Sequence, residues 1–402
     1  MTGVRTASLL RVRSGAERVT NIELFFDLVY VFAITQLSHH LLSQPTWEGA
    51  GQTLLLLAAV WLAWVYTAAA TNYLDPERMQ MRLLLLALML LSLVMSAALP
   101  TAFGTGALVV AGAYATIHVG RTLFVIVALR GEVLQRTFER VLPWYVVISC
   151  LWLLGAFGPT HVRELVWALA IAVDLLGGAV GYYTPGLGRS RTWDWTIEGN
   201  HFAERCQAFI LIALGESIVV IGANLAGLHT VTGSAVAAFI TAFVGSAALW
   251  WIYFDRSAEA GARRIAASHD PGRLGRSAYV FIHPIMVAGI IAAAAADAEV
   301  LAHPSRVGEA ATTWMVLGGA ALFLAGHALF IAVVWRVTPW SRIIAIIVLA
   351  LLGLLAPRVP ALALGICAVT VVFGVAATDR LRRSVADMNT PHPEHTMESA
   401  QS

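Results

Sequence analysis

The chain has 402 residues, of which 58% are hydrophobic and only 12% charged, and its mean hydropathy is +0.74. This composition excludes an ordinary soluble domain, in which roughly a quarter of the residues are charged. The net charge of +2 gives no indication of a nucleic-acid partner. We therefore expect an all-α, polytopic transmembrane helix bundle with the lipid bilayer as its surroundings.

Apolar runs of roughly 20 residues, the length that a helix needs to cross a bilayer, recur along the chain. They predict twelve spans, at 22–44, 49–74, 82–103, 106–129, 141–157, 163–183, 201–225, 232–254, 276–297, 311–335, 341–356 and 360–378. The fifth, eleventh and twelfth runs are short or bounded by proline. The sequence therefore admits ten to twelve spans.

The basic residues predict the orientation, and all 26 of them are arginines. If the N-terminus is cytoplasmic and twelve spans cross, only Arg163, Arg306 and Arg358 fall on the outer side, and this asymmetry follows the positive-inside rule. We expect a multi-pass protein of the cell inner (plasma) membrane with both termini cytoplasmic. Residues 1–21 form the N-terminal segment, without the apolar core of a cleaved signal peptide, and residues 381–402 form a polar, disordered tail.

The first span, IELFFDLVYVFAITQLSHHLL at residues 22–42, contains two acids, Glu23 and Asp27. Their i,i+4 spacing places them on one face of the helix. Charges inside a bilayer cost about 2.5 kcal/mol or more and usually face the bundle interior. We expect Asp27 to act in transport or gating, or to form a structural ion pair, whereas Glu23 lies close enough to the interface to snorkel.

Three further charged residues lie deeper in the predicted bilayer: Arg121 in the fourth span, Asp174 in the sixth and Glu216 in the seventh. Arg121 needs an acidic partner, which Asp27 or Asp174 can supply. Such a pair either fixes the helix register or exchanges partners during a cycle. Glu216, about 15 residues into its helix at 1.5 Å per residue, is the best single candidate for a proton or cation ligand.

Internal similarity indicates a duplication. GAYATIHVGRTLFVIVALR at 112–130 and GGAALFLAGHALFIAVVWR at 318–336 align without gaps, and Arg121 is matched by His327, which can titrate near neutral pH. The first and seventh spans align through Glu23 and Glu204. We predict two parallel six-helix repeats at 22–185 and 201–380, joined by a cytoplasmic linker at 186–200, with a site at their interface. The alternative is that the shared small residues serve only close helix packing.

The charge count within the spans favours a cationic occupant. Two guanidiniums, of Arg121 and Arg205, face five carboxylates: Glu23, Asp27, Asp174, Glu204 and Glu216. A desolvated carboxylate without a partner takes up a proton, so protons or a small cation are the natural occupants of the interior. Glu204 and Arg205 lie near the predicted interface, where snorkelling accounts for both.

Two segments, ELFFDLVYVFAITQLSHHL at 23–41 and HFAERCQAFILIALGESIVVIG at 201–222, resemble the bacterial low temperature requirement A (LtrA) family. The resemblance extends from Glu23 to about residue 380. It implies a multi-pass inner-membrane protein named for a growth phenotype in the cold, and it supplies neither a substrate nor a reaction. One departure is visible, because Cys206 and Gln207 stand where the family pattern has an aromatic residue and a glycine.

The sequence thus favours a proton- or cation-coupled secondary transporter with a site between the repeats and a small cation or proton-linked solute as cargo. A cation channel and a membrane-embedded lipid enzyme or sensor are the alternatives. We expect no enzyme, because nucleotide-binding, serine-nucleophile and zinc-protease motifs are absent from the sequence. We also expect no metal or other cofactor, since the three cysteines lack paired spacing and His201 and Glu204 have no evident third ligand. The oligomeric state is left open.

Overall fold

The computed structural model describes residues 9–11, 19–190, 199–268 and 270–388, which are almost entirely helical and contain no strand. The first half of the chain forms α1 (Asn21–Ser43), α2 (Trp47–Tyr73), α3 (Met79–Ala98), α4 (Ala107–Ala128), α5 (Val133–Phe157) and α6 (Thr160–Ala179). The second half forms α7 (Gly199–Ala226), α8 (Gly233–Ile252), the short α9 (Ala258–Ala266) and α10 (Pro271–Gly275), then α11 (His283–Ala302), α12 (Ala310–Trp335), α13 (Trp340–Leu355) and α14 (Ala361–Met388). Two π-helical segments, Tyr253–Ser257 and Arg276–Ile282, precede α9 and α11. The expectation of an all-α, polytopic bundle is confirmed.

Eleven helical segments of the described chain are long and apolar enough to cross a membrane. They correspond to all the predicted spans except the sixth, which is the helix α6. Within its 20 residues α6 carries Arg163, Glu164 and Asp174, and these charges lower its hydropathy. It packs against α5 and α2 nonetheless, so it is an integral part of the bundle.

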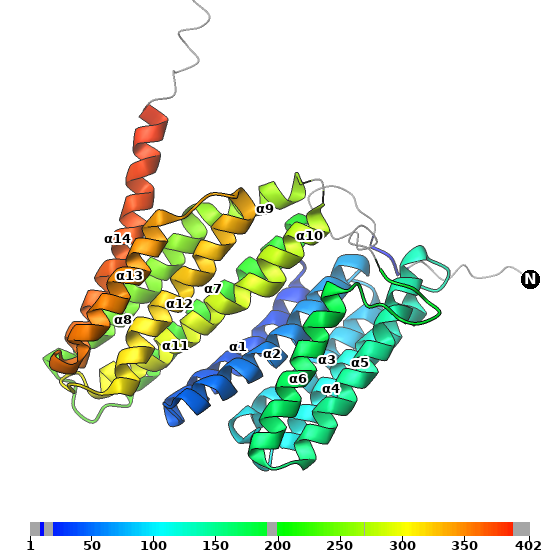
Figure 1. Cartoon of the computed structure of the whole chain (residues 1–402), viewed down its shortest axis with the longest axis horizontal. Helices are drawn as coiled ribbons and strands as arrows, with labels where there is room; N and C mark the ends of the chain where they lie inside the picture. The colour runs from blue at the N-terminus through cyan, green and yellow to red at the C-terminus, as the bar shows by residue number, and fades with distance from the viewer. Residues whose placement is uncertain (1–8, 12–18, 191–198, 269, 389–402) are drawn as a thin grey trace, which may run out of the picture.

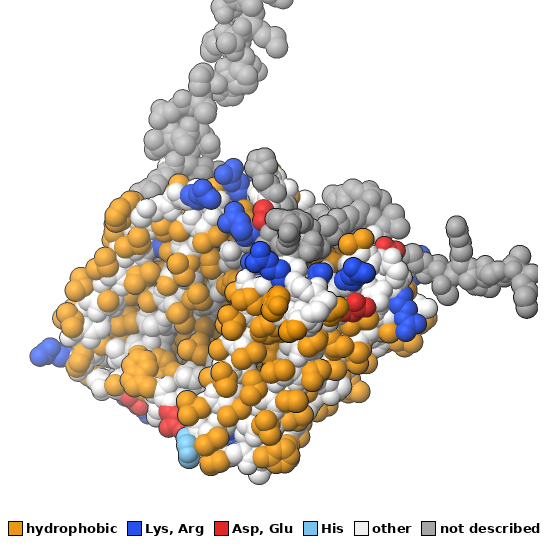
Figure 2. Space-filling view, turned by 45° about the vertical axis from the view of Figure 1, so that its right-hand side comes forward, with side chains coloured by type: hydrophobic (Ala, Val, Ile, Leu, Met, Phe, Trp, Pro, Cys, Tyr) orange, Lys and Arg blue, Asp and Glu red, His pale blue; other side chains and the backbone are white. Residues whose placement is uncertain are grey.

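The side wall of the bundle is apolar. Leu90, Leu154 and Leu354 expose 63%, 66% and 71% of their surface. In Figure 2 hydrophobic side chains cover the lateral surface, while arginines gather mainly along its upper edge. This distribution suits a bilayer, in which the hydrocarbon surrounds the wall and the charges lie at the interface.

The connections alternate between two faces of the bundle. We call the upper face in Figure 1, where α1 begins, α14 ends and α9 and α10 lie, the terminal face, and the other the opposite face. Leu10 pairs with Leu74 at the terminal face, and Val307 pairs with Pro360 at the opposite face. The alternation places Arg306 and Arg358 in connections at the opposite face and Arg163 at the end of α6 nearest to it.

The two halves pack their helices in the same order. In the first half α1 contacts α2 and α3, and α3, α4, α5 and α6 follow as successive neighbours; in the second half α7 contacts α8 and α11, and α11, α12, α13 and α14 follow likewise (Figure 1). The halves meet where α1 and α2 contact α7 and α11. Within the second half, Gly289 brings α11 very close to α12, because a Cβ atom there would lie 2.4 Å from the Phe323 nitrogen.

Three boundaries differ from the prediction. The helix α5 begins at Val133 instead of 141 and contains Pro143 in its interior, so proline does not mark its start. The helix α14 continues to Met388, so residues 381–388 are helical and are not part of a disordered tail; no glycine or proline interrupts 375–388. Of the predicted linker 186–200, residues 199–200 belong to α7, and 191–198 lie outside the described residues, as do 1–8, 12–18 and 389–402.

Candidate functional site

A buried ion-pair network joins α1 to α7. The Arg205 guanidinium donates from Nε to Asp27 Oδ2 at 2.9 Å and from Nη2 to Asp27 Oδ1 at 2.6 Å. Both side chains are 0% exposed. The Trp64 indole of α2 donates a further hydrogen bond of 2.7 Å to Asp27 Oδ1. The partner of the deep acid on α1 is therefore Arg205, and the network sits where the two halves of the bundle meet.

Glu23 extends this network towards the terminal face. Its Oε1 lies 3.2 Å from Arg205 Nη1 and 3.0 Å from His201 Nε2, and the Thr20 nitrogen and hydroxyl both donate to its Oε2 at 2.9 Å. The Arg11 guanidinium lies 3.7 Å from Oε1. Glu23 is 0% exposed, so it does not snorkel. Two carboxylates thus face two guanidiniums, and the charges of the network balance. We refer to Glu23, Asp27, His201 and Arg205 as the α1–α7 network.

Glu204 and Arg205 occupy different environments, although both were expected to snorkel. Consecutive residues of a helix point about 100° apart at 3.6 residues per turn. Arg205 accordingly faces α1, whereas Glu204 is exposed and lies outside the bundle interior. A sequence signal for the network exists, because the i,i+4 pair of acids on the first span is matched by His201 and Arg205, an i,i+4 pair of bases on the seventh.

Arg121 does not pair with Asp27 or Asp174 as expected. Its guanidinium donates to Ala63 O at 3.3 Å and to Thr67 Oγ1 at 3.1 Å, and it lies 3.3 Å from His118 Nδ1. No described carboxylate comes within 4 Å of it. The reason is that the nearer faces of α2 present hydroxyl and carbonyl groups, while Asp27 is already bound by Arg205.

Asp174 is held by tyrosines. Its two carboxylate oxygens accept hydrogen bonds of 3.1 Å from the Tyr66 hydroxyl and 3.2 Å from the Tyr114 hydroxyl, and its side chain is 0% exposed. Arg121 lies close enough to interact with it electrostatically. The sequence did not indicate this cluster, because an acid and two tyrosines on three different helices carry no spacing signal.

Glu216 lies on the same α1–α7 interface, nearer the opposite face. It is 3% exposed, and no partner for its Oε1 is found among the described residues. Thr35 and His39 of α1 are close enough to interact with its carboxylate. Glu216 is eleven residues beyond Arg205, and at 1.5 Å per residue this separates the two by about 16 Å along α7.

His327 belongs to a third cluster, in the second half. Arg342 Nε donates to its Nδ1 at 3.3 Å, and its Nε2 lies 2.8 Å from Ser257 Oγ. Arg342 also forms an ion pair with Asp379 of α14. His327, which the sequence aligns with Arg121, is therefore a neutral histidine whose Nδ1 accepts and whose Nε2 donates. The predicted site residues thus fall into three regions: the α1–α7 network, the surroundings of Asp174 and Arg121, and the surroundings of His327. Glu216 lies on the same interface as the α1–α7 network, and Glu204 belongs to none of these regions.

Asp297 was not singled out in the sequence, where it marks the end of the predicted ninth span. It is half-buried in α11 and, with Ser217 and Ser246, lines a cavity of about 50 Å³ within the second half. Its position in the run IIAAAAADAEV, as the first charge after an alanine-rich stretch, is the signal that could have revealed it.

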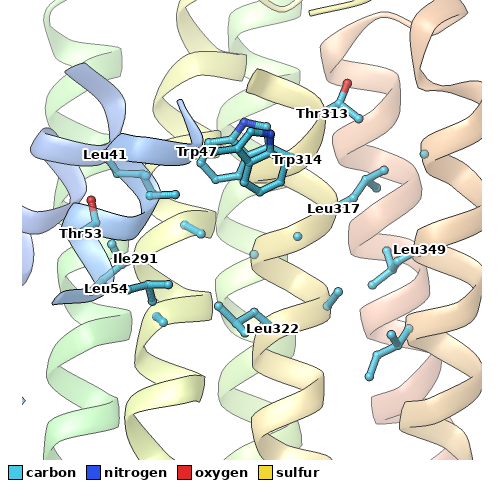
Figure 3. A pocket seen from close by; sticks show the side chains of 18 of the residues that line it. Leu41, Trp47, Thr53, Leu54, Ile291, Thr313, Trp314, Leu317, Leu322 and Leu349 are labelled. Atoms are coloured by element: carbon cyan, nitrogen blue, oxygen red, sulfur yellow. The ribbon is translucent and has the colours of Figure 1, made fainter. Parts of the chain in front are cut away.

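An apolar groove of about 520 Å³ separates parts of the two halves near the opposite face. Figure 3 shows Leu41 and Leu54 on one side and Leu317, Leu322 and Leu349 on the other. The Trp47 and Trp314 rings stack across it with centroids 5.4 Å apart. Its lining offers almost no polar atoms, so the groove suits hydrocarbon and cannot hold an ion.

Comparison with known proteins agrees with the resemblance seen in the sequence. The family model described as "Bacterial low temperature requirement A protein (LtrA)" matches residues 18–377. The chain is also 35% identical over 372 residues to the uncharacterized protein RA0937 of Rhizobium meliloti (strain 1021), with 90% of each chain covered.

Proposed function

Because the chain belongs to the bacterial low temperature requirement A (LtrA) family and is a multi-pass helical bundle, we propose that it is a proton- or cation-coupled secondary transporter of the inner membrane. In this proposal both termini are cytoplasmic, so the terminal face is the cytoplasmic face. The coupling site lies between the two six-helix halves. The observation that carries the proposal is the buried carboxylate oxygen Oε1 of Glu216 at the α1–α7 interface, for which the described part of the chain offers no hydrogen-bond partner.

A buried carboxylate oxygen without a donor is costly, because desolvation is not compensated by a hydrogen bond. The cost disappears when the group binds a proton or coordinates a cation. Glu216 therefore supports a role as the coupled-ion ligand. Thr35 and His39 beside it provide further polar groups, and His39 is exposed near the end of α1 at the opposite face. Access to Glu216 accordingly runs from the opposite face.

The α1–α7 network supports a barrier at the terminal face. Its four side chains are fully buried, and together with the nearby Arg11 guanidinium their charges balance, so the network holds α1 against α7 and leaves no unpaired charge to attract an ion. In this proposal a closed contact near the terminal face, with Glu216 placed nearer the opposite face, corresponds to one state of an alternating-access cycle. Parallel repeats of transporters commonly place their site at the interface between the repeats, and the matching order of helix contacts in the two halves agrees with such a repeat.

The ion pair between Arg205 and Asp27 favours a transporter over a cation channel, because the Arg205 guanidinium lies directly on the interface between the halves. A cation channel would need a continuous line of polar groups along this interface. The proposal assigns the protein no chemical reaction.

Reconstituted protein in liposomes, with a pH-sensitive dye inside and imposed cation gradients, tests this function. We expect cation-dependent proton flux that Glu216→Gln abolishes. Glu204→Gln is the matched control, because Glu204 lies on the same helix but is exposed and outside the interior. The proton flux of this variant should equal that of the wild type. Full flux in a correctly assembled Glu216→Gln protein would refute the assigned role of Glu216, and an uncoupled electrogenic current would favour the channel.

A further inference from the structure

A second cavity lies near the terminal face, between helices of the first half and segments of the second half. Its volume is about 100 Å³. Its walls come from α2, α4, α5 and α6 on one side, and from Phe202 of α7, Gly272 of α10 and the π-helical segment Arg276–Ile282 on the other. A cavity of about 150 Å³ binds benzene and a water molecule occupies about 30 Å³ of liquid, so this space holds a ligand of about four to six heavy atoms.

Two guanidiniums line this cavity. Arg121 is 3% exposed and has only neutral hydrogen-bond partners among the described residues. Arg276 donates from Nη1 to Gly178 O at 2.7 Å, while its buried Nε has no partner in the described part of the chain. A buried cation without a counter-charge is strongly unfavourable, so among the described residues the cavity lacks negative charge.

The acid nearest to this cavity does not supply that charge. Asp174 is bound to Tyr66 and Tyr114, and it acts on Arg121 only at long range. Even with Asp174 ionised, two guanidiniums face one carboxylate. Tyr182, beyond the end of α6, also lines the cavity, and burial raises the pKa of its phenol above the ordinary value, so it adds no negative charge.

The remaining walls combine apolar side chains, among them Ala69, Val141 and Leu175, with Thr122 and with tyrosines that include Tyr66 and Tyr145. A ligand that fits must therefore have an anionic end for the guanidiniums and a short hydrocarbon end for these side chains. Carboxylates meet the first requirement best, because the planar guanidinium matches their geometry with two parallel hydrogen bonds. A doubly charged inorganic anion would leave oxygens facing alkyl groups without donors.

We infer that this cavity binds a small monocarboxylate, of the size of acetate or propionate, with its carboxylate at Arg121 and Arg276 and its alkyl end against Ala69 and Val141. Binding requires only the cavity. That the bound anion is the transported solute, moving together with the proton, rests on the function proposed above.

Binding of radiolabelled propionate to the purified full-length protein, measured by scintillation proximity, tests the inference. Unlabelled propionate and acetate should displace the label, whereas propionamide, its neutral analogue of the same shape, should not. We expect Arg121→Gln and Arg276→Gln each to weaken binding at least about tenfold, as the loss of a charge-assisted hydrogen bond implies. Ala69→Leu should abolish binding by filling the cavity, and Arg130→Gln, an exposed arginine just beyond α4, should leave it unchanged.

Size-exclusion chromatography confirms that each variant is folded, and Ala69→Leu tests the cavity without touching a charge. Absence of propionate binding by the wild type would overturn the inference, as would equal competition by propionamide or by nitrate. Propionate binding without proton flux would support the binding site and refute the proposed transporter function. Proton flux without propionate binding would support the transporter function and refute the binding site.

Discussion

The substitution Arg205→Gln probes the α1–α7 network most directly. It removes the bidentate contact to Asp27 and the 3.2 Å contact to Glu23, and it also removes the 3.1 Å hydrogen bond from Nη1 to Thr71 Oγ1. Two buried carboxylates are then left close together without their common cation. Breaking a buried ion pair in this way typically costs about 3–5 kcal/mol. Against a usual total of about 5–15 kcal/mol, such a loss is severe.

Asp27→Asn should cost less, about 1–3 kcal/mol, because the amide keeps an oxygen for the Trp64 indole and Arg205 retains Glu23 as a counter-charge. The double variant should cost less than the sum of the two single variants, since each single change leaves its partner unsatisfied. The free energy of unfolding can be measured by titration with sodium dodecyl sulfate in mixed micelles, with the fluorescence of the 13 tryptophans as the signal.

Glu204→Gln is the control here as well, because this residue precedes Arg205 and is exposed. Exposed substitutions of this kind usually change the free energy of unfolding by less than about 0.5 kcal/mol. If Arg205→Gln were no more costly than Glu204→Gln, or if the double variant were strictly additive, the network would not hold the halves together and the assignment of a barrier would fail.

Two further predictions concern packing and topology. Gly289→Ala should lower the free energy of unfolding by about 1–3 kcal/mol, because the added methyl group overpacks against Phe323. Gly318→Ala is the control and should not lower it, since a Cβ atom there meets nothing within 4 Å. Equal effects of the two substitutions in the same titration would contradict the close approach of α11 and α12. In a cysteine-free background, a membrane-impermeant maleimide applied to intact spheroplasts should label His303→Cys and not Glu132→Cys, and the reverse pattern would invert the proposed orientation.

The sequence predicts the bundle well because helix length and hydropathy are local properties. Its boundaries fail where a tertiary contact extends a helix, as in α14, whose residue Asp379 lies beyond the predicted span and pairs with Arg342 of α13. The depth of Asp27 predicts that it faces the protein, since a position in lipid would be too costly, and it is buried; Glu23, expected to snorkel, is buried as well. The identity of their partner was not predictable from depth alone.

Which acid each arginine contacts depends on the rotation of its helix about the helix axis, and the sequence does not determine this rotation. Arg121 and Arg205 are both arginines within apolar helices, and their depth in the sequence predicts that Arg121 pairs with the acids and that Arg205 lies at the interface. The structure reverses these roles because α7 turns Arg205 towards α1, while α4 turns Arg121 towards α2. The tyrosines around Asp174 were missed for the same reason, since Tyr66 and Tyr114 converge only after α2 and α4 have packed.

The helix α2 connects the two regions to which we assign function. Trp64 and Thr71 lie about two helical turns apart and bind Asp27 and Arg205, whereas Ala63 and Thr67 bind Arg121. One buried helix therefore contacts the α1–α7 network and Arg121 through adjacent faces, since Thr67 lies about one turn from both Trp64 and Thr71. An anion that draws Arg121 away from its contacts on α2 changes the packing of the same helix turns that hold the network. Anion binding at Arg121 can then be coupled to opening at the terminal face through α2 alone.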